Sequence, residues 1–286
     1  MISIIMPIFN DEKFTKDALD SIMAQTYKNF ELIIIEDHST DNSPKIISLF
    51  KDKRIKVYVN EINLGIAKSR NKALKIAKGD YIFFTDSDCI ADKDWLKEGI
   101  KTFNTYKCLG VEGLTYYVKK GYKPSISDKF PGTAETPGIY LGCNIAYTKD
   151  IMMKLHGYDE RYHYHDDREF AIRVKKCGKI VHCDKMIITH QNKSWDCKSY
   201  IKACTRVRDW ILLFKEHHDT TFMTGRILFP RGLIKIFFPP LIFVPLFKHK
   251  NNTLLDYRLV LCSYVKFVYE RIYIWKTAFK ERVFII

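Results

Sequence analysis

Two carboxylates that follow a short apolar run are the side chains best placed to do chemistry. Asp86 and Asp88 come directly after the run 81–84, so a buried strand would carry both to one edge of a sheet. Paired carboxylates suit Mg²⁺ or Mn²⁺ on a diphosphate, and such a cation offsets the charge of a departing diphosphate. For the triplet alone, a pair that only caps a helix beginning near Asp92 is an equally good interpretation.

A second acidic strand end occurs earlier in the chain. The run 30–35 leads into Asp37, and an acidic residue after an early strand of an α/β sheet often accepts hydrogen bonds from a ribose or a base. Asp41 and Ser43 are equally well explained by a turn that caps the helix around Pro44. We therefore retain Asp37 as the candidate nucleoside-binding residue.

A loop with the helix after it, and a late histidine, provide further candidates for binding a phosphate or a metal ion. Gly65 permits a tight loop after Asn63, and the helix that follows would present free N–H groups. Arg70, on that helix, could reach a phosphate, although an exposed arginine on an ordinary helix is the simpler interpretation. His190 ends another apolar run and is a candidate metal ligand, while a lone histidine is more often structural.

Two adjacent acids, Asp166 and Asp167, stand at the start of a predicted helix. They gain from the helix dipole, and their mutual repulsion can raise one pKa toward the range of a general base. A solvated, well-capped helix would carry the same residues without any chemistry. The nearby His163 and His165 alternate with tyrosines, which favours one face of a loop over a metal site.

The elements that must position these residues alternate between strand and helix. This alternation implies an α/β fold with a mostly parallel central sheet flanked by helices. Gly79 is expected to cap the helix before the 81–84 run, and residues 105–145 to form a strand and a long substrate-side loop. Strands are predicted at 2–8, 30–35, 55–59, 81–84 and 180–190, and helices at 14–23, after Pro44, and at 66–77, 150–155, 168–177 and 198–217.

The last fifth of the chain differs in composition. The formal net charge is +14, and residues 226–286 hold 11 Lys and Arg against 3 Asp and Glu, so 11 − 3 = +8. Residues 227–247 are apolar but contain Arg231, Lys235 and four prolines. These residues argue against a regular spanning helix and for an in-plane or re-entrant membrane segment.

Residues 254–286 have the pattern of an aromatic and basic helix. We expect residues 1–215 to form one domain and residues 216–286 a helical extension that adheres to an anionic membrane surface. A buried oligomer interface is the alternative for the apolar stretch. The positive charge would permit nucleic acid as a partner, but the sequence contains no nucleic-acid-binding motif, so none is expected.

The cysteines and the start of the chain bear on the cellular compartment. Eight cysteines occur and no two have Cys-x-x-Cys spacing, which argues against a structural zinc site. A strand-like run begins at Ile2, which leaves no room for a targeting peptide. We therefore expect reduced thiols and a cytoplasmic location, peripheral on the inner face of the cell membrane.

These features occur together in the order found in family 2 glycosyltransferases of the GT-A fold, which residues 1–215 resemble. The resemblance implies that Pro7 and Asp37 line the pocket for the base and ribose. The matching stretches are Ile2–Asn10, Ser21–Tyr27, Glu36–Asp41, Asn63–Gly65, Arg70–Asn71, Asp86–Asp88, Gly142–Asn144, Asp166–Asp167 and His190.

The resemblance also implies roles for the other candidates. Asn63, Gly65 and Arg70 would lie near the nucleotide. Asp88 and His190 would hold a divalent cation, Mn²⁺ or Mg²⁺, and Asp86 would contact the ribose or sugar. Asp167 would be the catalytic base. The acceptor region would hold Gly142, Asn144 and Asp166, the last standing where the family has Glu.

The implied function is an inverting, metal-dependent transfer of a sugar from a nucleotide-diphospho-sugar to a hydroxyl of a glycan or glycolipid acceptor. The apolar and basic C-terminal region predicts that this acceptor is lipid-linked. Three alternatives stay open: a polyprenyl-phosphate glycosyltransferase, whose phosphate acceptor needs no general base; a nucleotidyltransferase; and a non-catalytic sugar-nucleotide-binding or scaffold protein. The intact set of acids argues against the last.

Overall fold

The structure is a computed structural model that describes residues 1–117, 137–191, 196–219 and 254–283. These residues divide into two compact units. The first runs to Gln191 and contains the sheet, and the second contains the described residues from Asp196 onward. The division lies at a different point from the boundary after residue 215 that the sequence analysis predicted.

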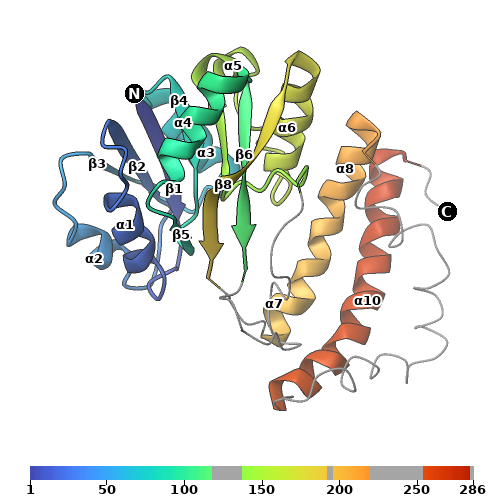
Figure 1. The fold of residues 1–286 in the computed structure, drawn as a ribbon. Coiled ribbons are helices and arrows are strands. Elements are labelled where there is room, and N and C mark those ends of the chain that lie inside the picture. Colours follow the sequence, from blue (N-terminus) through green and yellow to red (C-terminus); the bar gives the residue numbers. More distant parts are fainter. Residues whose placement is uncertain (118–136, 192–195, 220–253, 284–286) are drawn as a thin grey trace. The chain divides into compact units, whose positions relative to one another are not determined.

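The first unit is built on one mixed sheet with the strand order β3-β2-β1-β4-β7-β6-β8-β5 (Figure 1). β1 pairs in parallel with β2 and β4, whereas β7 pairs antiparallel with β4 and β6. All five predicted strands are present, and the sheet is parallel in its first half and mixed in its second. The strands are β1 (Ile2–Ile8), β2 (Phe30–Glu36), β3 (Ile55–Val59), β4 (Tyr81–Phe84), β5 (Cys89–Ala91), β6 (Gly110–Tyr116), β7 (Ile145–Thr148) and β8 (Ile180–His190).

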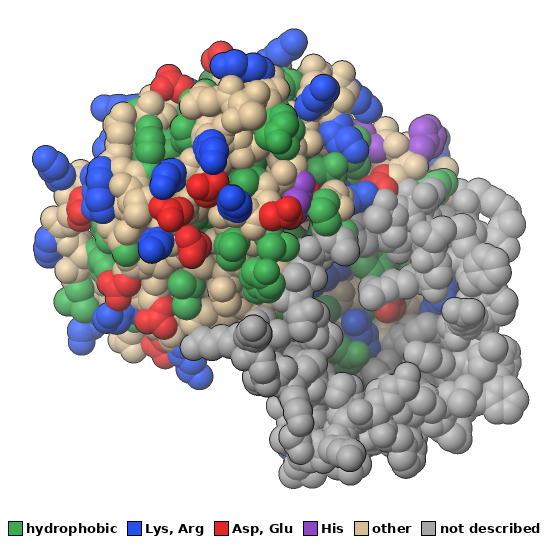
Figure 2. Space-filling view, viewed as in Figure 1, with side chains coloured by type: hydrophobic (Ala, Val, Ile, Leu, Met, Phe, Trp, Pro, Cys, Tyr) green, Lys and Arg blue, Asp and Glu red, His purple; other side chains and the backbone are tan. Residues whose placement is uncertain are grey.

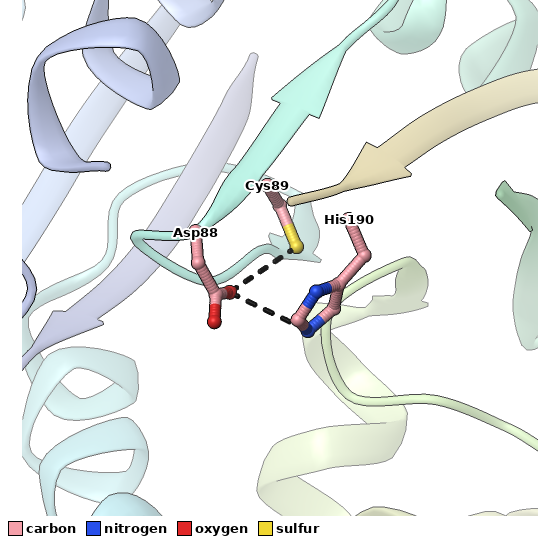
Figure 3. A group of neighbouring side chains, drawn as sticks. All are labelled: Asp88, Cys89 and His190. Atoms are coloured by element: carbon pink, nitrogen blue, oxygen red, sulfur yellow. Dashed lines mark hydrogen bonds and ion pairs between the residues drawn. The ribbon is translucent and has the colours of Figure 1, made fainter. Parts of the chain in front are cut away.

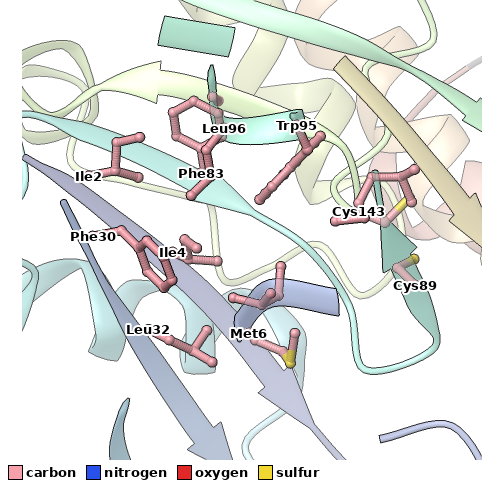
Figure 4. Packing of buried hydrophobic residues seen from close by; sticks show 14 of the residues in the cluster. Ile2, Ile4, Met6, Phe30, Leu32, Phe83, Cys89, Trp95, Leu96 and Cys143 are labelled. Carbon is pink, nitrogen blue, oxygen red and sulfur yellow. The ribbon is translucent and has the colours of Figure 1, made fainter. Parts of the chain in front are cut away.

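The central strands contribute to two hydrophobic cores, because successive side chains of a strand point to opposite faces. Ile4 and Met6 join one core, and Ile5 joins the other. In the first core, shown in Figure 4, the Phe83 and Trp95 rings pack edge to face with centroids 5.2 Å apart. Burial of both faces explains the continuous apolar runs of β1 and β2. The first face is covered by α1 (Thr15–Met23), α2 (Ser43–Ser48) and α4 (Trp95–Tyr106), and the second by α3 (Ile66–Ile76), α5 (Lys149–Lys154) and α6 (Asp166–Cys177).

The prediction that Gly79 caps α3 is wrong. The helix ends at Ile76, and its C-cap is Ala77 in an extended conformation. Glycine at position 79 is required by a close approach instead, because a Cβ there would lie 2.4 Å from the backbone nitrogen of Ser3. The Gly79 N–H donates to Ser3 Oγ at 2.8 Å, which fixes the chain where it enters β4.

The second unit is helical. The single helix predicted over 198–217 is interrupted by a 3₁₀ segment, in which the Thr205 hydroxyl donates to the Lys202 carbonyl at 2.9 Å. The helix predicted for the C-terminal region is present as far as Glu281. The elements are α7 (Cys197–Lys202), the 3₁₀ helix η1 (Ala203–Arg206), α8 (Val207–His217) and α10 (Leu254–Glu281).

α10 has one buried and one exposed face. Its buried face packs on α8 in a small core that includes Trp210, Ile211 and Ile274. Four exposed apolar side chains recur at helical spacing on the other face, and we call them the outer stripe; they are Val265, Tyr269, Ile272 and Phe279. Lys276 and Lys280 are exposed beside the stripe.

Among the residues that the structure describes, no helix combines the length and apolarity needed to cross a bilayer. The apolar stretch 227–247, predicted to lie in the membrane, is outside the described residues. On the face of the first unit visible in Figure 2, Lys and Arg side chains are interspersed with Asp and Glu.

Candidate active site

The carboxyl ends of β1, β2 and β4 border a cleft of about 280 Å³. β1 lies between β2 and β4, so the strand order reverses direction at β1. Open α/β sheets bind ligands at such a topological switch point. The structure thus brings six of the predicted residues to one cleft. They are Pro7, Asp37, Asn63, Gly65, Asp86 and Asp88.

The interpretation in which Asp86 and Asp88 cap a helix is wrong. The strand β5 separates them from α4, which begins at Trp95 with Asp94 as its N-cap residue. Both carboxylates belong to the turn between β4 and β5 and line the cleft. Their position favours ligand binding over capping.

Asp37 is 3% exposed, and its carboxylate organises the loop after β3. Its Oδ1 accepts hydrogen bonds from Asn60 Nδ2 at 2.7 Å and from the Leu64 N–H at 2.8 Å. Its Oδ2 accepts a bond from the Gly65 N–H at 2.9 Å, and Asn63 Nδ2 donates to the Asp37 carbonyl at 3.2 Å. Gly65 has a φ of +84°, which favours glycine. Asp37 therefore shapes this side of the cleft through the loop that holds Asn63 and Gly65.

Sequence reasoning missed Asp11, which lines the cleft from the loop after β1. Its Oδ2 accepts a hydrogen bond from Ser87 Oγ at 2.5 Å, so this loop is joined to the turn after β4. The Asn10 N–H donates to Ser39 Oγ at 3.1 Å, which joins the same loop to the turn after β2. The only sequence signal for Asp11 is an acid shortly after the first strand.

Arg70 is 2% exposed and joins three parts of the site. Its guanidinium donates to Asp166 Oδ2 at 3.0 Å, to Asp86 Oδ1 at 3.1 Å and to the Gly142 carbonyl at 3.0 Å. The interpretation of Arg70 as an exposed arginine is wrong. Burial raises the pKa of Asp86 above its ordinary value, although the charge of Arg70 acts against this.

Asp167 lies in the first turn of α6, and two backbone N–H groups hold its carboxyl group. Burial and the adjacent Asp166 raise its pKa to about 7. Its Oδ2 accepts a hydrogen bond from the Gly142 N–H at 2.7 Å, and its Oδ1 accepts one from the Arg168 N–H at 2.7 Å. A carboxyl group that is held in position and titrates near neutrality can take a proton from a substrate hydroxyl.

β8 pairs antiparallel with β5 and brings His190 beside the turn after β4 (Figure 3). His190 Nε2 lies 3.5 Å from Asp88 Oδ1, and the Gln191 N–H donates to the Asp88 carbonyl at 2.7 Å. With the Cys89 sulfur, these side chains offer three ligand atoms within 4.8 Å of one another. A carboxylate, an imidazole and a thiol at these separations fit a divalent cation.

Hydrogen bonds through Arg70 and Gly142 join the start of α6 to the turn after β4. The Arg70 guanidinium donates to Asp86 and to Asp166, and it also donates to the Gly142 carbonyl. The Gly142 N–H in turn donates to Asp167. Residues from the turn after β4 and from the start of α6 thus form a single site.

Asn144 lies in the core next to this site and is 1% exposed. Its Oδ1 accepts a hydrogen bond from Trp95 Nε1 at 2.8 Å, and its Nδ2 donates to the carbonyls of Leu114 at 3.0 Å and Met186 at 3.2 Å. The amide is thus used to join α4, β6 and the residues of β8. It supports the segment that carries Gly142.

Comparison with known proteins identifies the family. Residues 3–160 match the model of glycosyl transferase family 2. The chain belongs to this family. The expected GT-A fold is confirmed by its likeness to the crystal structure of S. aureus TarS in complex with UDP, with a TM-score of 0.57, 24% identity, and coverage of 74% of this chain and 65% of that one.

A second structural neighbour is the mannosyltransferase PcManGT from Pyrobaculum calidifontis in complex with GDP-Man and Mn²⁺. Its TM-score is 0.59 at 19% identity, and the match covers 76% of this chain and 64% of that one. Both neighbours are less than 25% identical to this chain, so their likeness is evidence only for its fold.

The curated relatives differ in how much of their length is matched. An uncharacterized glycosyltransferase of Haemophilus influenzae is 45% identical over 100 residues, which are 34% of this chain and 40% of that protein. The Escherichia coli protein WfaP, a UDP-Glc:α-D-GlcNAc-diphosphoundecaprenol β-1,3-glucosyltransferase, is 33% identical over 185 residues, which are 63% of this chain and 71% of that protein.

Proposed function

We propose that this chain is an inverting, metal-dependent glycosyltransferase that moves a sugar from a nucleotide-diphospho-sugar to a hydroxyl of a lipid-linked glycan. The observation that carries the proposal is the placement of four acids from three segments around one site. Asp37, Asp86 and Asp88 line the cleft, and hydrogen bonds through Gly142 and Arg70 join Asp167 to Asp86.

The donor nucleotide would occupy the cleft at the ends of β1, β2 and β4. In this proposal Pro7 and Asp37 border the base and ribose, and Asp86 contacts the ribose or sugar. Asp88 and His190 would hold a divalent cation, Mn²⁺ or Mg²⁺, which supplies positive charge to the diphosphate. Mn²⁺ is supported by the named complex of PcManGT.

Asp167 would take the proton of the acceptor hydroxyl. As that proton leaves, the hydroxyl oxygen forms a bond to the anomeric carbon, and the bond from this carbon to the diphosphate oxygen breaks on the opposite face. The configuration therefore inverts, and the nucleoside diphosphate departs with the electron pair. The pKa of about 7 suits this role, because a base that titrates near the working pH combines availability with strength.

A lipid-linked acceptor is supported by two observations. The name of WfaP describes action on a diphosphoundecaprenol-linked sugar. The outer stripe of α10, with Lys276 and Lys280 beside it, has the apolar and basic character that adheres to an anionic lipid surface. We therefore propose a peripheral enzyme on the inner face of the cell membrane.

The test is a screen of nucleotide sugars with Mn²⁺ or Mg²⁺, in which released nucleoside diphosphate is measured with and without a GlcNAc-diphospho-lipid acceptor. The proposal predicts release that needs the cation and increases with the acceptor. Release of pyrophosphate would identify a nucleotidyltransferase instead. Binding of a donor without turnover, in the presence of acceptor, would identify a non-catalytic protein.

A further inference from the structure

Cys89 lies directly opposite His190 in the antiparallel pair of β5 and β8. Directly opposed side chains of such a pair project from the same face of the sheet, with Cβ atoms about 4.5–5.5 Å apart. Figure 3 shows the Cys89 sulfur and the His190 ring on the same side as the Asp88 carboxylate, and both approach it. The strand register therefore places a sulfur atom beside the two side chains to which the proposed function assigns the cation.

The distances among the three groups suit a shared ion. Cys89 Sγ lies 3.6 Å from Asp88 Oδ1, and His190 Nε2 lies 3.5 Å from the same oxygen. All three ligand atoms lie within 4.8 Å of one another. Ligands bound to one ion at about 2.0–2.3 Å in a tetrahedral arrangement lie about 3–4 Å apart. Small side-chain movements would therefore bring all three atoms onto one ion.

We propose that Cys89 is the third protein ligand of the cation and makes the site selective for thiophilic divalent ions. The inference rests on the proposed function, in which Asp88 and His190 hold that ion. Mg²⁺ prefers oxygen ligands, whereas a thiolate with an imidazole favours Zn²⁺ and Co²⁺. The expected order of affinity is Zn²⁺ above Mn²⁺ above Mg²⁺. The thiol proton passes to solvent on binding.

The competing explanation is a structural role. Cys89 is completely buried and belongs to the hydrophobic core that also contains Cys143. Cys143 belongs to the same core as Cys89 but is not part of the three-ligand group. Cys143 is therefore a matched control, because it is buried beside Cys89 and should affect packing without affecting ligation.

The experiment is a titration of the full-length, metal-free protein with Co²⁺, followed by absorption spectroscopy. A cobalt–thiolate bond produces a charge-transfer band in the near ultraviolet that oxygen and nitrogen ligands do not produce. The Cys197→Ser chain serves as the background, because the Cys197 thiol raises the pKa of Cys262 in the second unit and this pair of free thiols could bind cobalt there. The proposal predicts the band in this background and with added Cys143→Ser, and its loss with Cys89→Ser.

Calorimetry provides a second readout. Cys89→Ser should weaken Zn²⁺ binding by about tenfold to 100-fold or more, and Mg²⁺ binding by much less. A cobalt complex without the band, or a band that survives Cys89→Ser, would overturn the ligation by Cys89. If the band depends on Cys89 and is lost in Asp88→Ala, but no donor sugar is transferred, the metal site stands and the proposed function fails. If transfer needs Asp88 but the band is absent, only the role of Cys89 fails.

Discussion

Arg70 Nη1 lies 3.0 Å from Asp166 Oδ2, and both side chains are 2% exposed. The ion pair joins α3 to the start of α6, next to Asp167. The same guanidinium lies 3.1 Å from Asp86 Oδ1. One buried cation therefore holds two acids of the site, and its removal would leave charge without a partner in a poorly solvated region.

Replacement of Arg70 by methionine should lower the free energy of unfolding by about 3–5 kcal/mol, because breaking a buried pair leaves uncompensated charge. Arg161→Met is the matched control. Arg161 lies 2.5 Å from Asp159, but these side chains are 59% and 21% exposed, so its loss should cost about 0–1 kcal/mol. Urea unfolding followed by circular dichroism compares the two, and similar losses would contradict a central role for Arg70.

The pKa of about 7 for Asp167 predicts a pH dependence of transfer. The base must be ionised, so kcat/KM should rise with pH up to about 7 and level off above it. Asp167→Asn should lower kcat by about 10²–10⁴ and remove this rise. Asp150→Asn, an exposed acid in the first turn of α5, should change neither quantity. Full activity in Asp167→Asn would favour a polyprenyl-phosphate acceptor, which needs no base.

Asp88→Ala should abolish cation-dependent transfer, with a loss of about 100-fold or more in metal affinity, because a direct ligand contributes at least as much as the groups that orient it. The variant should stay folded, since the Asp88 backbone bond to Gln191 remains. Asp184→Ala, an exposed acid on the same strand as His190, is the control. Calorimetric titration with Mn²⁺ measures the effect. An unchanged Mn²⁺ affinity in Asp88→Ala would contradict the assignment of Asp88 as a metal ligand.

The outer stripe of α10 predicts membrane binding that mutation can reduce. Ile272→Ser with Phe279→Ser should weaken binding to anionic vesicles by about tenfold or more, because two large apolar side chains lose their burial in lipid. Leu49→Ser, which changes an exposed apolar residue of the first unit, should have little effect. Vesicle flotation at low and high salt measures the binding. A double variant that floats like the unchanged chain would contradict the role of α10.

The sequence predicted the strands and their acidic ends well, because each leaves a local signal. β1 and β8 begin and end at the predicted residues, since their apolar runs have clear limits. Parallel strands end at one edge of a sheet, so the meeting of Asp37, Asp86 and Asp88 in one cleft followed from local patterns.

The remaining features depend on pairings between distant segments. β5 has three residues and no periodicity, so the register that sets Cys89 opposite His190 could not be predicted. The burial of Arg70 depends on α6, which lies far along the chain and supplies Asp166. Glycine often ends a helix, so the sequence predicted a cap at Gly79. Only the close approach of Gly79 to the backbone of β1 shows why glycine is required there.

The central claim is inverting transfer with Asp167 as the base and a cation held by Asp88. The most direct measurement is the anomeric configuration of the product, determined by NMR on the lipid-linked acceptor with the donor selected in the screen. The account predicts a β-linkage from an α-linked donor, formed only with a divalent cation and not by Asp167→Asn. A product with retained configuration, or one formed equally well after chelation of the cation, would contradict it.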